Sequence, residues 1–306
     1  MGFDLPVAIS KYVKLGKFGK KLHTFLPVEA WGRKGNRELA VKFKNFRPEL
    51  VLVVGNCPVN FGILAFMKSI SPDSKIVLFW PDTLINLEQQ QLNAASFIDV
   101  AAVYSKACEP LFSKMGYGKT AWVPFAGDLN FLKGKVAIGS SFLYDLSFIG
   151  GWRPERESYL SVIADNFPSL RIHVQGFYWK ENCKDKRLLN SFSPTPLLAG
   201  DFGDLIRQSA INLNVIDDTN YPGANMRFFE VPAAGGLQLC SSCPELESQF
   251  TDMEKIIFFN GPDEMVSKIK WIVEHPEQAD VIRKAGHEYV KENHTYRNRI
   301  NQLISI

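Results

Sequence analysis

A short segment, residues 225–241 with the sequence NMRFFEVPAAGGLQLCS, holds side chains well suited to binding a ligand. Arg227 and Glu230 are its only charged residues, and an unpaired charge in such apolar surroundings costs several kcal/mol. Three residues apart on a helix, they lie on one face. A carboxylate accepts both hydroxyls of a ribose and a guanidinium neutralises a diphosphate, so the pair predicts a nucleotide site. A plain ion pair is the alternative.

A second candidate site lies where a strand meets a helix. An apolar strand over 144–149 leads into the sequence GGWRPER and then into a helix over 157–166. A strand, a glycine turn and a helix start form a common phosphate-binding layout, because free backbone N–H groups face the anion. We therefore expect Gly151, Arg153 and Arg156 to bind phosphate, with an exposed pair of loop arginines as the alternative.

Aromatic residues follow the next strand of the same half. The strand over 171–175 is succeeded by the sequence GFYW. This order predicts a backbone and aromatic wall beside a nucleotide base, with Gln175 and Phe177 as the contacts. Aromatic residues after a strand also commonly belong to the core, and that alternative stays open.

The run RFFE at 227–230, followed by PAAGG and a short apolar strand, resembles the donor-site signature of GT-B glycosyltransferases. It is most similar to the spore-maturation-protein-like branch of the group 1 glycosyltransferases. The resemblance implies that Glu230 contacts the ribose of a sugar nucleotide. Group 1 enzymes carry another glutamate eight residues upstream, where this chain has Pro222. The transferred sugar, whether a hexose or a pentose, and a retaining or inverting outcome therefore stay open.

The loop before this signature is polar and rich in turn-forming residues, with the sequence DDTNYPG at 217–223. In the resembled family this loop lies over the diphosphate and the donor sugar. The resemblance therefore implies that Asn220, Tyr221 and Asn225 contact the sugar or phosphate. A turn built from Asx residues needs no such role, and this alternative has equal weight.

Strands alternate with helices along the whole chain, which predicts an α/β fold with doubly wound parallel sheets. With 306 residues, 46% of them hydrophobic, the chain is long enough for two cores. The resemblance implies two Rossmann-like domains that face each other across a cleft. The expected parts are an acceptor domain at 1–126, a linker at 127–142, a donor domain at 143–285 and a C-terminal helix at 286–306 that packs back on the first domain. The first domain lacks the glycine-punctuated first strand expected of such a fold.

No Asp-x-Asp triplet occurs in the sequence, so we expect a site that needs no metal, with Arg153, Arg156 and Arg227 stabilising the leaving diphosphate. On the acceptor side, Asp82 follows a predicted strand in the sequence FWPDT. A carboxylate at a strand end suits a general base if the enzyme inverts, whereas a turn-forming aspartate is the duller explanation. Asp82, Arg227 and Glu230 are thus the predicted catalytic residues.

Charge is unevenly distributed along the chain. Residues 1–50 contain eleven Lys or Arg and four Asp or Glu, a net charge of +7, so the remainder carries −4 of the total of +3. Lysines recur at near-helical spacing between 11 and 21, either as a solvated face or as a surface for an anionic acceptor such as a glycan, a lipid-linked group or a nucleic acid.

Five cysteines, an odd number, argue against a disulfide framework, and no apolar run is long enough to span a membrane. The chain is therefore expected to be cytoplasmic.

Together these features predict a transferase that moves a sugar from a nucleotide-diphosphate sugar, expected to be a UDP-sugar, to an acceptor hydroxyl without a cofactor. A non-catalytic nucleotide-sugar-binding protein is one alternative, because of Pro222. A nucleic-acid-modifying glycosyltransferase is another, because of the basic first 50 residues.

Overall fold

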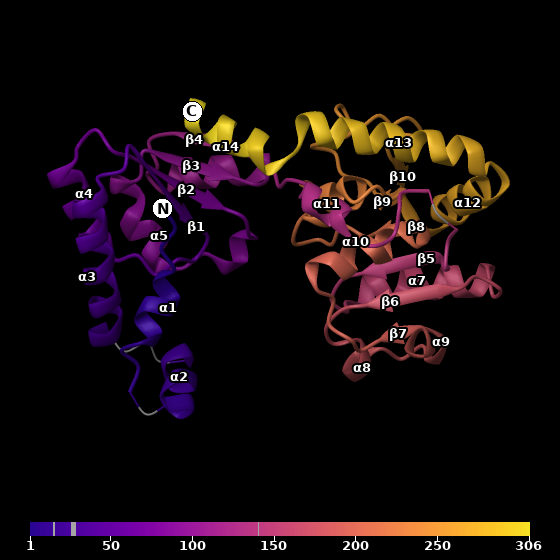
Figure 1. The fold of residues 1–306 in the computed structure, drawn as a ribbon, viewed down its shortest axis with the longest axis horizontal. Helices are drawn as coiled ribbons and strands as arrows, with labels where there is room; N and C mark the ends of the chain where they lie inside the picture. The colour runs from indigo at the N-terminus through magenta and orange to yellow at the C-terminus, as the bar shows by residue number, and fades with distance from the viewer. Residues whose placement is uncertain (15, 26–28, 140) are drawn as a thin grey trace. The chain divides into compact units, whose positions relative to one another are not determined.

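The computed structural model describes residues 1–14, 16–25, 29–139 and 141–306. The chain forms two compact units (Figure 1). Unit 1 comprises Met1–Val123 and Gln302–Ile306, and unit 2 comprises Pro124–Asn301. Within the described ranges, no helix is both long and apolar enough to cross a membrane. Each unit is an α/β structure with a parallel sheet, which confirms the predicted fold class.

Unit 1 is built on a four-stranded parallel sheet in the order β1-β2-β3-β4. Its strands are β1 (Leu50–Val54), β2 (Lys75–Trp80), β3 (Val100–Val103) and β4 (Thr120–Trp122). The run of apolar residues in β2 and β3 is buried on both faces, as is typical of parallel sheets. The β1 strand lies at one edge, and its Leu52 and Val54 are exposed.

Helices occupy the start of unit 1, where a first strand was expected. They are α1 (Leu5–Ser10), α2 (Gly16–Phe25) and α3 (Glu29–Phe46). The later helical elements of the unit are α4 (Phe61–Ile70), η1 (Leu84–Asn86), α5 (Gln89–Ala94), η2 (Ala95–Phe97), η3 (Lys106–Cys108) and α6 (Glu109–Lys114). The buried side chain of Asn36 links α3 to the start of α4, because its amide donates to the Pro58 carbonyl and accepts from the Asn60 N–H.

Unit 2 contains a six-stranded parallel sheet in the order β10-β9-β8-β5-β6-β7. Its strands are β5 (Tyr144–Ile149), β6 (Ile172–Gln175), β7 (Phe192–Ser193), β8 (Ser209–Asn214), β9 (Gln238–Ser241) and β10 (Ile257–Phe259). The chain winds outward from β5 in one direction and from β8 in the other. The strand order therefore reverses between β5 and β8, and ligands of such sheets bind beyond the carboxyl ends of the strands at this point.

Helices cover both faces of the unit 2 sheet. They are η4 (Leu129–Lys133), α7 (Pro154–Asn166), α8 (Trp179–Asn182), α9 (Lys186–Asn190), α10 (Ala199–Arg207), α11 (Arg227–Ala233), α12 (Gly261–Glu274) and α13 (Pro276–Asn293). Leu146 and Phe148 of β5 enter the large core under α7 and α12, whereas Ile149 packs against a smaller cluster under α10 and α11. Successive strand residues thus serve opposite faces, which makes the sheet doubly wound.

Residues 127–142, expected to be a linker, are counted with unit 2, although Ser140 lies outside the described residues. The carboxylate of Asp204 on α10 accepts hydrogen bonds from the backbone N–H groups of Lys135 and Val136, at 3.1 and 2.9 Å. The η4 turn packs on the same helix. These contacts attach the segment to the second unit.

The last helix, α14 (Tyr296–Ser305), contains residues of both units. Its early part belongs to unit 2, where Arg299 donates to the carbonyls of Pro124 and Phe125 at 2.8 and 3.0 Å. Its final residues belong to unit 1, where Leu303 is buried in the core beside β2 and β3. The chain therefore passes between the units twice, after Val123 and after Asn301.

Candidate functional site

A pocket of about 410 Å³ lies in unit 2 beyond the carboxyl ends of β5, β6 and β7. It is lined by Phe131, Ile149, Gly150, Gly151, Gln175, Gly176, Phe177, Ser193, Pro194, Thr195, Pro196, Leu197, Leu198, Phe202, Met226, Arg227 and Glu230. Five of the predicted donor-site residues are among these, and they come from three separate segments of the chain: the loop after β5, the end of β6 with the loop after it, and helix α11. The position agrees with the reversal of strand order beside β5. We call this hollow the unit 2 pocket.

The α11 helix brings Arg227 and Glu230 to the pocket. The two side chains form an ion pair one helical turn apart, and Glu230 is buried with 6% of its surface exposed. The Arg227 guanidinium also donates to the Ile149 carbonyl at 3.2 Å and lies 4.7 Å from the centre of the Phe202 ring. Without a ligand the arginine thus satisfies the buried carboxylate, as the ion-pair alternative expected. Both groups still face the pocket.

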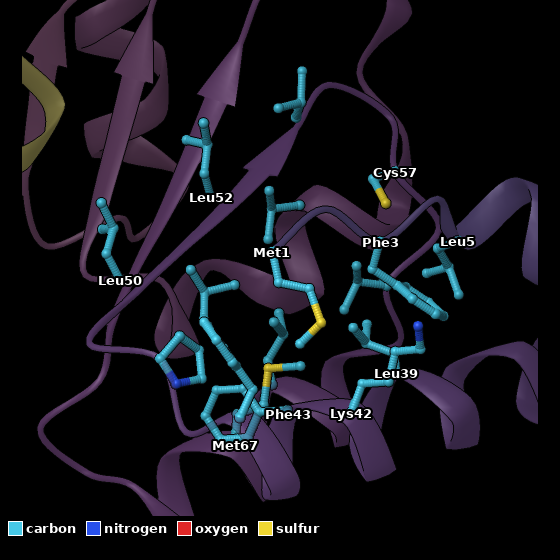
Figure 2. A pocket seen from close by; sticks show the side chains of 17 residues that line it. Met1, Phe3, Leu5, Leu39, Lys42, Phe43, Leu50, Leu52, Cys57 and Met67 are labelled. Carbon is cyan, nitrogen blue, oxygen red and sulfur yellow. The ribbon is translucent and has the colours of Figure 1, made fainter. Parts of the chain in front are cut away.

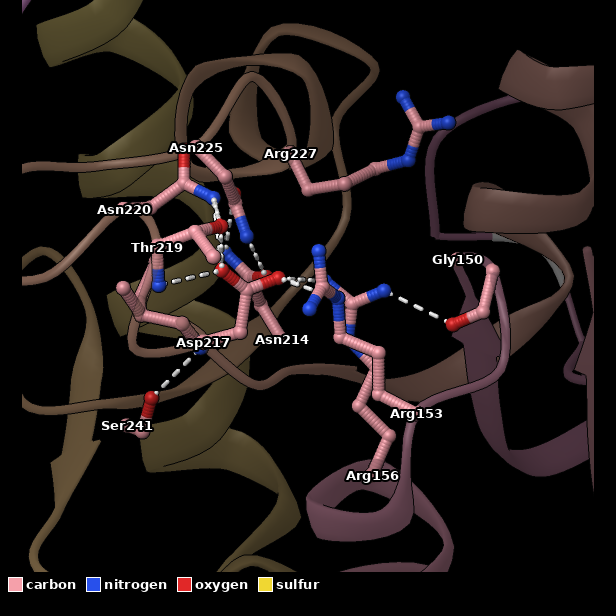
Figure 3. Close-up of polar contacts among 12 residues, drawn as sticks. Gly150, Arg153, Arg156, Asn214, Asp217, Thr219, Asn220, Asn225, Arg227 and Ser241 are labelled. Carbon is pink, nitrogen blue, oxygen red and sulfur yellow. Dashed lines mark hydrogen bonds and ion pairs between the residues drawn. The ribbon is translucent and has the colours of Figure 1, made fainter. Parts of the chain in front are cut away.

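Arg153 and Arg156 converge on one buried carboxylate, that of Asp217 in the loop after β8 (Figure 3). Asp217 Oδ2 lies 3.1 Å from Arg153 Nε and 2.8 Å from Arg156 Nη2. Arg156 Nη1 also donates to the carbonyl of Gly151, a residue of the pocket, at 2.8 Å. Arg156 is mostly buried, whereas the Arg153 side chain is 42% exposed. The alternative of two exposed loop arginines therefore describes Arg153 but not Arg156, because only Arg153 has substantial solvent access.

Burial and charge shape the protonation of this cluster. Burial alone would raise the pKa of Asp217. Hydrogen bonds from Thr219 and Asn220 and the charges of the two arginines lower the pKa by more than burial raises it, so it lies below its ordinary value. Burial lowers the pKa of Arg156, the charge of Asp217 opposes this, and the charges of Arg153 and Arg227 add to the lowering. Asp217 is therefore ionised at neutral pH.

Two strand ends approach each other closely at the floor of the pocket. Gly176 has φ +148°, and a Cβ added there would lie 1.9 Å from the Gly150 carbonyl oxygen. Beside it, the buried Gln175 amide donates to the Thr195 carbonyl and its oxygen lies 2.9 Å from His173 Nε2. Phe177 is 79% exposed at the rim. The aromatic side chain that follows this strand is thus outside the core and available to a ligand.

The remaining predicted donor contacts have structural partners of their own. Asn220 donates to Asp217 Oδ1 at 2.9 Å, in agreement with an Asx-rich turn. The amides of Asn225 and Asn214 form a reciprocal pair, and Asn225 Oδ1 also accepts from the Phe228 N–H at the start of α11. Tyr221 is 56% exposed. Asn220, Tyr221 and Asn225 do not line the unit 2 pocket among the described residues.

Asp82 lies in unit 1, in the turn after β2. Its two carboxylate oxygens accept from the Thr83 N–H at 2.7 Å and from the Asn86 amide at 2.9 Å. The Asn86 carbonyl in turn accepts from the amide of Asn56 at 3.1 Å. This is the arrangement that a turn-forming aspartate requires.

Unit 1 has a pocket of a different kind, of about 280 Å³, between its first residues, α3, α4 and the edge strand β1 (Figure 2). Its lining is almost entirely apolar, and Lys42 is the only charged lining residue among those described. Such a surface offers nothing to the hydroxyls or phosphates of a nucleotide. The features expected of a donor site are therefore found in unit 2.

Sequence reasoning missed three parts of this site. Asp217 was not identified as a binding or positioning residue, because its arginine partners are about sixty residues away in the sequence. The loop around Thr195 was missed because β7 before it has only two residues. Phe131, which packs against Phe202 at the pocket with tilted rings 4.7 Å apart between their centres, fell in the expected linker.

Comparison with solved structures identifies the architecture. A glycosyltransferase from Rickettsia africae aligns with a TM-score of 0.67 at 11% identity, over 98% of this chain and 92% of that one. Anabaena HepE in complex with UDP aligns with a TM-score of 0.61 at 11% identity, over 98% and 94%. The E. coli trehalose-6-phosphate structure bound with UDP-2-fluoro glucose aligns with a TM-score of 0.62 at 11% identity, over 90% and 78%.

This chain has the GT-B fold. Residues 156–305 also match the family model described as "Glycosyl transferase-like". That match covers most of unit 2, including α11 and the loop with Asp217, but not β5 or the glycines after it. Comparison with curated proteins gives no significant match. The GT-B architecture agrees with the predicted fold, and the family match lies in the half that carries the unit 2 pocket.

Proposed function

We propose that this protein is a glycosyltransferase that moves a sugar from a UDP-sugar to an acceptor hydroxyl, with the donor held in the unit 2 pocket. The main support is that one pocket in a GT-B fold is lined by Arg227, Glu230 and the glycine loop at 150–151. That UDP is bound by Anabaena HepE supports the choice of nucleotide. Membership of the spore-maturation-protein-like branch is part of the proposal, supported by the run RFFE followed by PAAGG.

In the proposed complex Glu230 accepts the ribose hydroxyls, and its present partner Arg227 turns to the diphosphate. The exchange keeps both charges paired, so neither is left buried without a partner. Phe177 stacks on the base at the rim, with the Gln175 backbone beside it. Asn220, Tyr221 and Asn225 border the donor sugar and phosphates from the loop before α11. The positive side chains, rather than a metal ion, stabilise the leaving diphosphate.

The acceptor side of the proposal rests on unit 1. Asp82 is proposed as the general base of an inverting reaction, from its place at the carboxyl end of β2. The net charge of +7 in residues 1–50 supports an anionic acceptor, whether glycan, lipid-linked group or nucleic acid. All five cysteines are free thiols, which supports the proposed cytoplasmic location.

A nucleotide screen tests the proposal. Melting temperature and calorimetric binding would be measured with UDP, GDP, CDP, ADP and TDP, with their common sugar conjugates, and with NAD as a control, each with and without EDTA. We expect selective stabilisation by UDP that EDTA does not change. Stabilisation by NAD alone, or by no nucleotide, would contradict the proposal, and a loss of UDP binding in EDTA would contradict metal independence.

A non-catalytic nucleotide-sugar-binding protein is the second candidate. Pro222 stands at the position of the upstream glutamate, and the loop that carries it holds its polar groups in internal contacts such as Asn220 to Asp217. Release of UDP from the bound UDP-sugar in the presence of candidate acceptors separates the two. Sustained release would exclude the binding-only function, whereas tight binding without any release, including slow hydrolysis, favours it.

A further inference from the structure

Asp217 sits where the sheet of unit 2 reverses its strand order. Its loop follows β8, whereas Arg153 and Arg156 come from the loop and helix that follow β5. The two strands are hydrogen-bonded neighbours at the centre of the sheet. The carboxylate therefore joins the two chain segments that flank the expected ligand crevice.

The two oxygens of Asp217 have separate partners (Figure 3). Oδ1 accepts from the Thr219 N–H at 3.1 Å, the Thr219 hydroxyl at 2.6 Å and the Asn220 amide at 2.9 Å. Oδ2 faces the two guanidinium groups, at 3.1 Å from Arg153 and 2.8 Å from Arg156. The loop thus fixes the carboxylate from one side, and the carboxylate fixes both arginines from the other.

Three arginines gather around the two buried carboxylates of this region. Arg153 and Arg156 pair with Asp217, Arg227 pairs with Glu230, and the charge of Glu155 also acts on Arg156. Asp217 is 3% exposed, and Arg156 Nε is buried without a hydrogen-bond partner among the described residues. A buried donor without a partner is costly unless something fills the position. A phosphate oxygen bound beside Arg156 would supply that acceptor.

We propose that Asp217 is a positioning residue for the donor diphosphate, which it serves by holding Arg153 and Arg156 in the orientation that binds it. The inference rests on the proposed function, because it concerns the same unit 2 site. It assigns Asp217 no contact with the donor. Its effect is transmitted through the two arginines, and Asn220 acts on the donor site through Asp217.

The sign of the effect separates positioning from simple electrostatics. Asp217→Asn removes a negative charge beside the phosphate site, so through-space electrostatics alone would make UDP bind more tightly. If Asp217 instead orients the arginines, the same change weakens UDP, because two flexible guanidinium groups must be ordered on binding. We expect UDP to bind about tenfold more weakly, about 1.4 kcal/mol. Uridine, which lacks phosphate, should bind with unchanged affinity.

Calorimetric titration of UDP and uridine into the wild type and the variants makes this test. Asp217→Glu keeps the charge and should recover part of the UDP affinity. Asp185→Asn is the matched control, since Asp185 also pairs with an arginine of unit 2, Arg187, but at the start of α9 rather than in the loops after β5 and β8. It should leave both affinities unchanged. UDP binding to Asp217→Asn that equals or exceeds the wild type would overturn the inference, as would an equal loss of uridine binding.

A milder variant covers the case in which Asp217→Asn does not fold. Thr219→Val removes the hydroxyl that donates to Asp217 Oδ1 and keeps both charges. We expect about threefold weaker UDP binding with uridine unaffected, and an unchanged UDP affinity would then overturn the inference. A wild type that binds no nucleoside diphosphate would refute the proposed function itself. Equal UDP binding by the wild type and the variant would instead refute only the positioning role of Asp217.

Discussion

The strand ends of the two units carry polar residues with very different partners. In unit 1, Asp82 and Asn56 bond to groups of the turns around β1 and β2. In unit 2, Asp217 holds arginines from another strand's loop, and Arg227 reaches the Ile149 carbonyl across the sheet. The Asp217 carboxylate thus joins two separate loops, whereas the Asp82 carboxylate accepts hydrogen bonds from its own turn. The contrast teaches that the charged side chains at the strand ends of unit 2 are preorganised by one another, whereas Asp82 of unit 1 is held by its turn.

The largest expected effect tests how rigid the unit 2 pocket is. Gly176→Ala places a Cβ 1.9 Å from the Gly150 oxygen at a φ of +148°, so backbone must move. We expect the free energy of unfolding to fall by about 3 kcal/mol or more, with loss of UDP binding. Calorimetric melting without and with UDP measures the stability and the UDP binding.

Gly116→Ala in unit 1 is the control for this variant. It has φ +93° but nothing within 4 Å of the added Cβ, and should cost only about 1 kcal/mol. Equal losses in the two variants would show that the close approach of the strand ends in unit 2 is unimportant.

The second prediction concerns the division of labour between the units. Asp82→Asn should lower kcat by about a hundredfold, the contribution typical of a general base. It should leave UDP affinity unchanged, because the proposed donor pocket lies in unit 2. Steady-state kinetics and calorimetry separate the two quantities. The exposed Asp73 of unit 1 provides a control, since Asp73→Asn removes the same charge. A kcat equal to that of the control would leave Asp82 as a turn residue only.

A third prediction uses pH. Burial, together with the charges of Arg299 and Lys255, lowers the pKa of His294 in unit 2 to about 3. The unfolded chain takes up this proton near pH 6.5, but the folded chain does so only near pH 3. Acid therefore favours unfolding, and stability falls as the pH drops below 6.5. By pH 5 the loss should reach about 2 kcal/mol relative to pH 7.

His294→Asn cannot titrate over this range and serves as the reference for that measurement. Denaturant unfolding at pH 7, 6 and 5 gives the difference between the two proteins, and amide exchange shows where it arises. Protection in unit 2 should decrease before protection in unit 1. A constant difference in stability across the three pH values would show that the imidazole has the same pKa in the folded and the unfolded protein.

The smallest expected effect sharpens the assignment within the pocket. Glu230→Ala should weaken UDP binding by about tenfold, because the ribose hydroxyls lose their acceptor. The same change should affect 2′,3′-dideoxy-UDP little, since that ligand has no hydroxyls to offer. Glu288→Ala is the control, as Glu288 forms an exposed ion pair with Lys291 in the same unit. Equal losses for both ligands would mean that Glu230 serves only to pair with Arg227.

The sequence predicted the regular elements better than the contacts between them. The strand at 144–149 was confirmed to the residue, because the glycines that follow it mark its end. The helix expected over 157–166 instead spans Pro154–Asn166, since proline suits the first position of a helix. Which residues line the pocket depends on strand order, and no local pattern encodes this.

The return of the chain to unit 1 at Gln302–Ile306 has a consequence for synthesis on the ribosome. Leu303 contributes to the core of unit 1, and the Ile306 carbonyl accepts a hydrogen bond from Lys119. These groups are translated after all of unit 2. Unit 1 therefore cannot complete its core until unit 2 has been translated. A released chain that ends before residue 302 would contain all of unit 2 but would lack part of the core of unit 1.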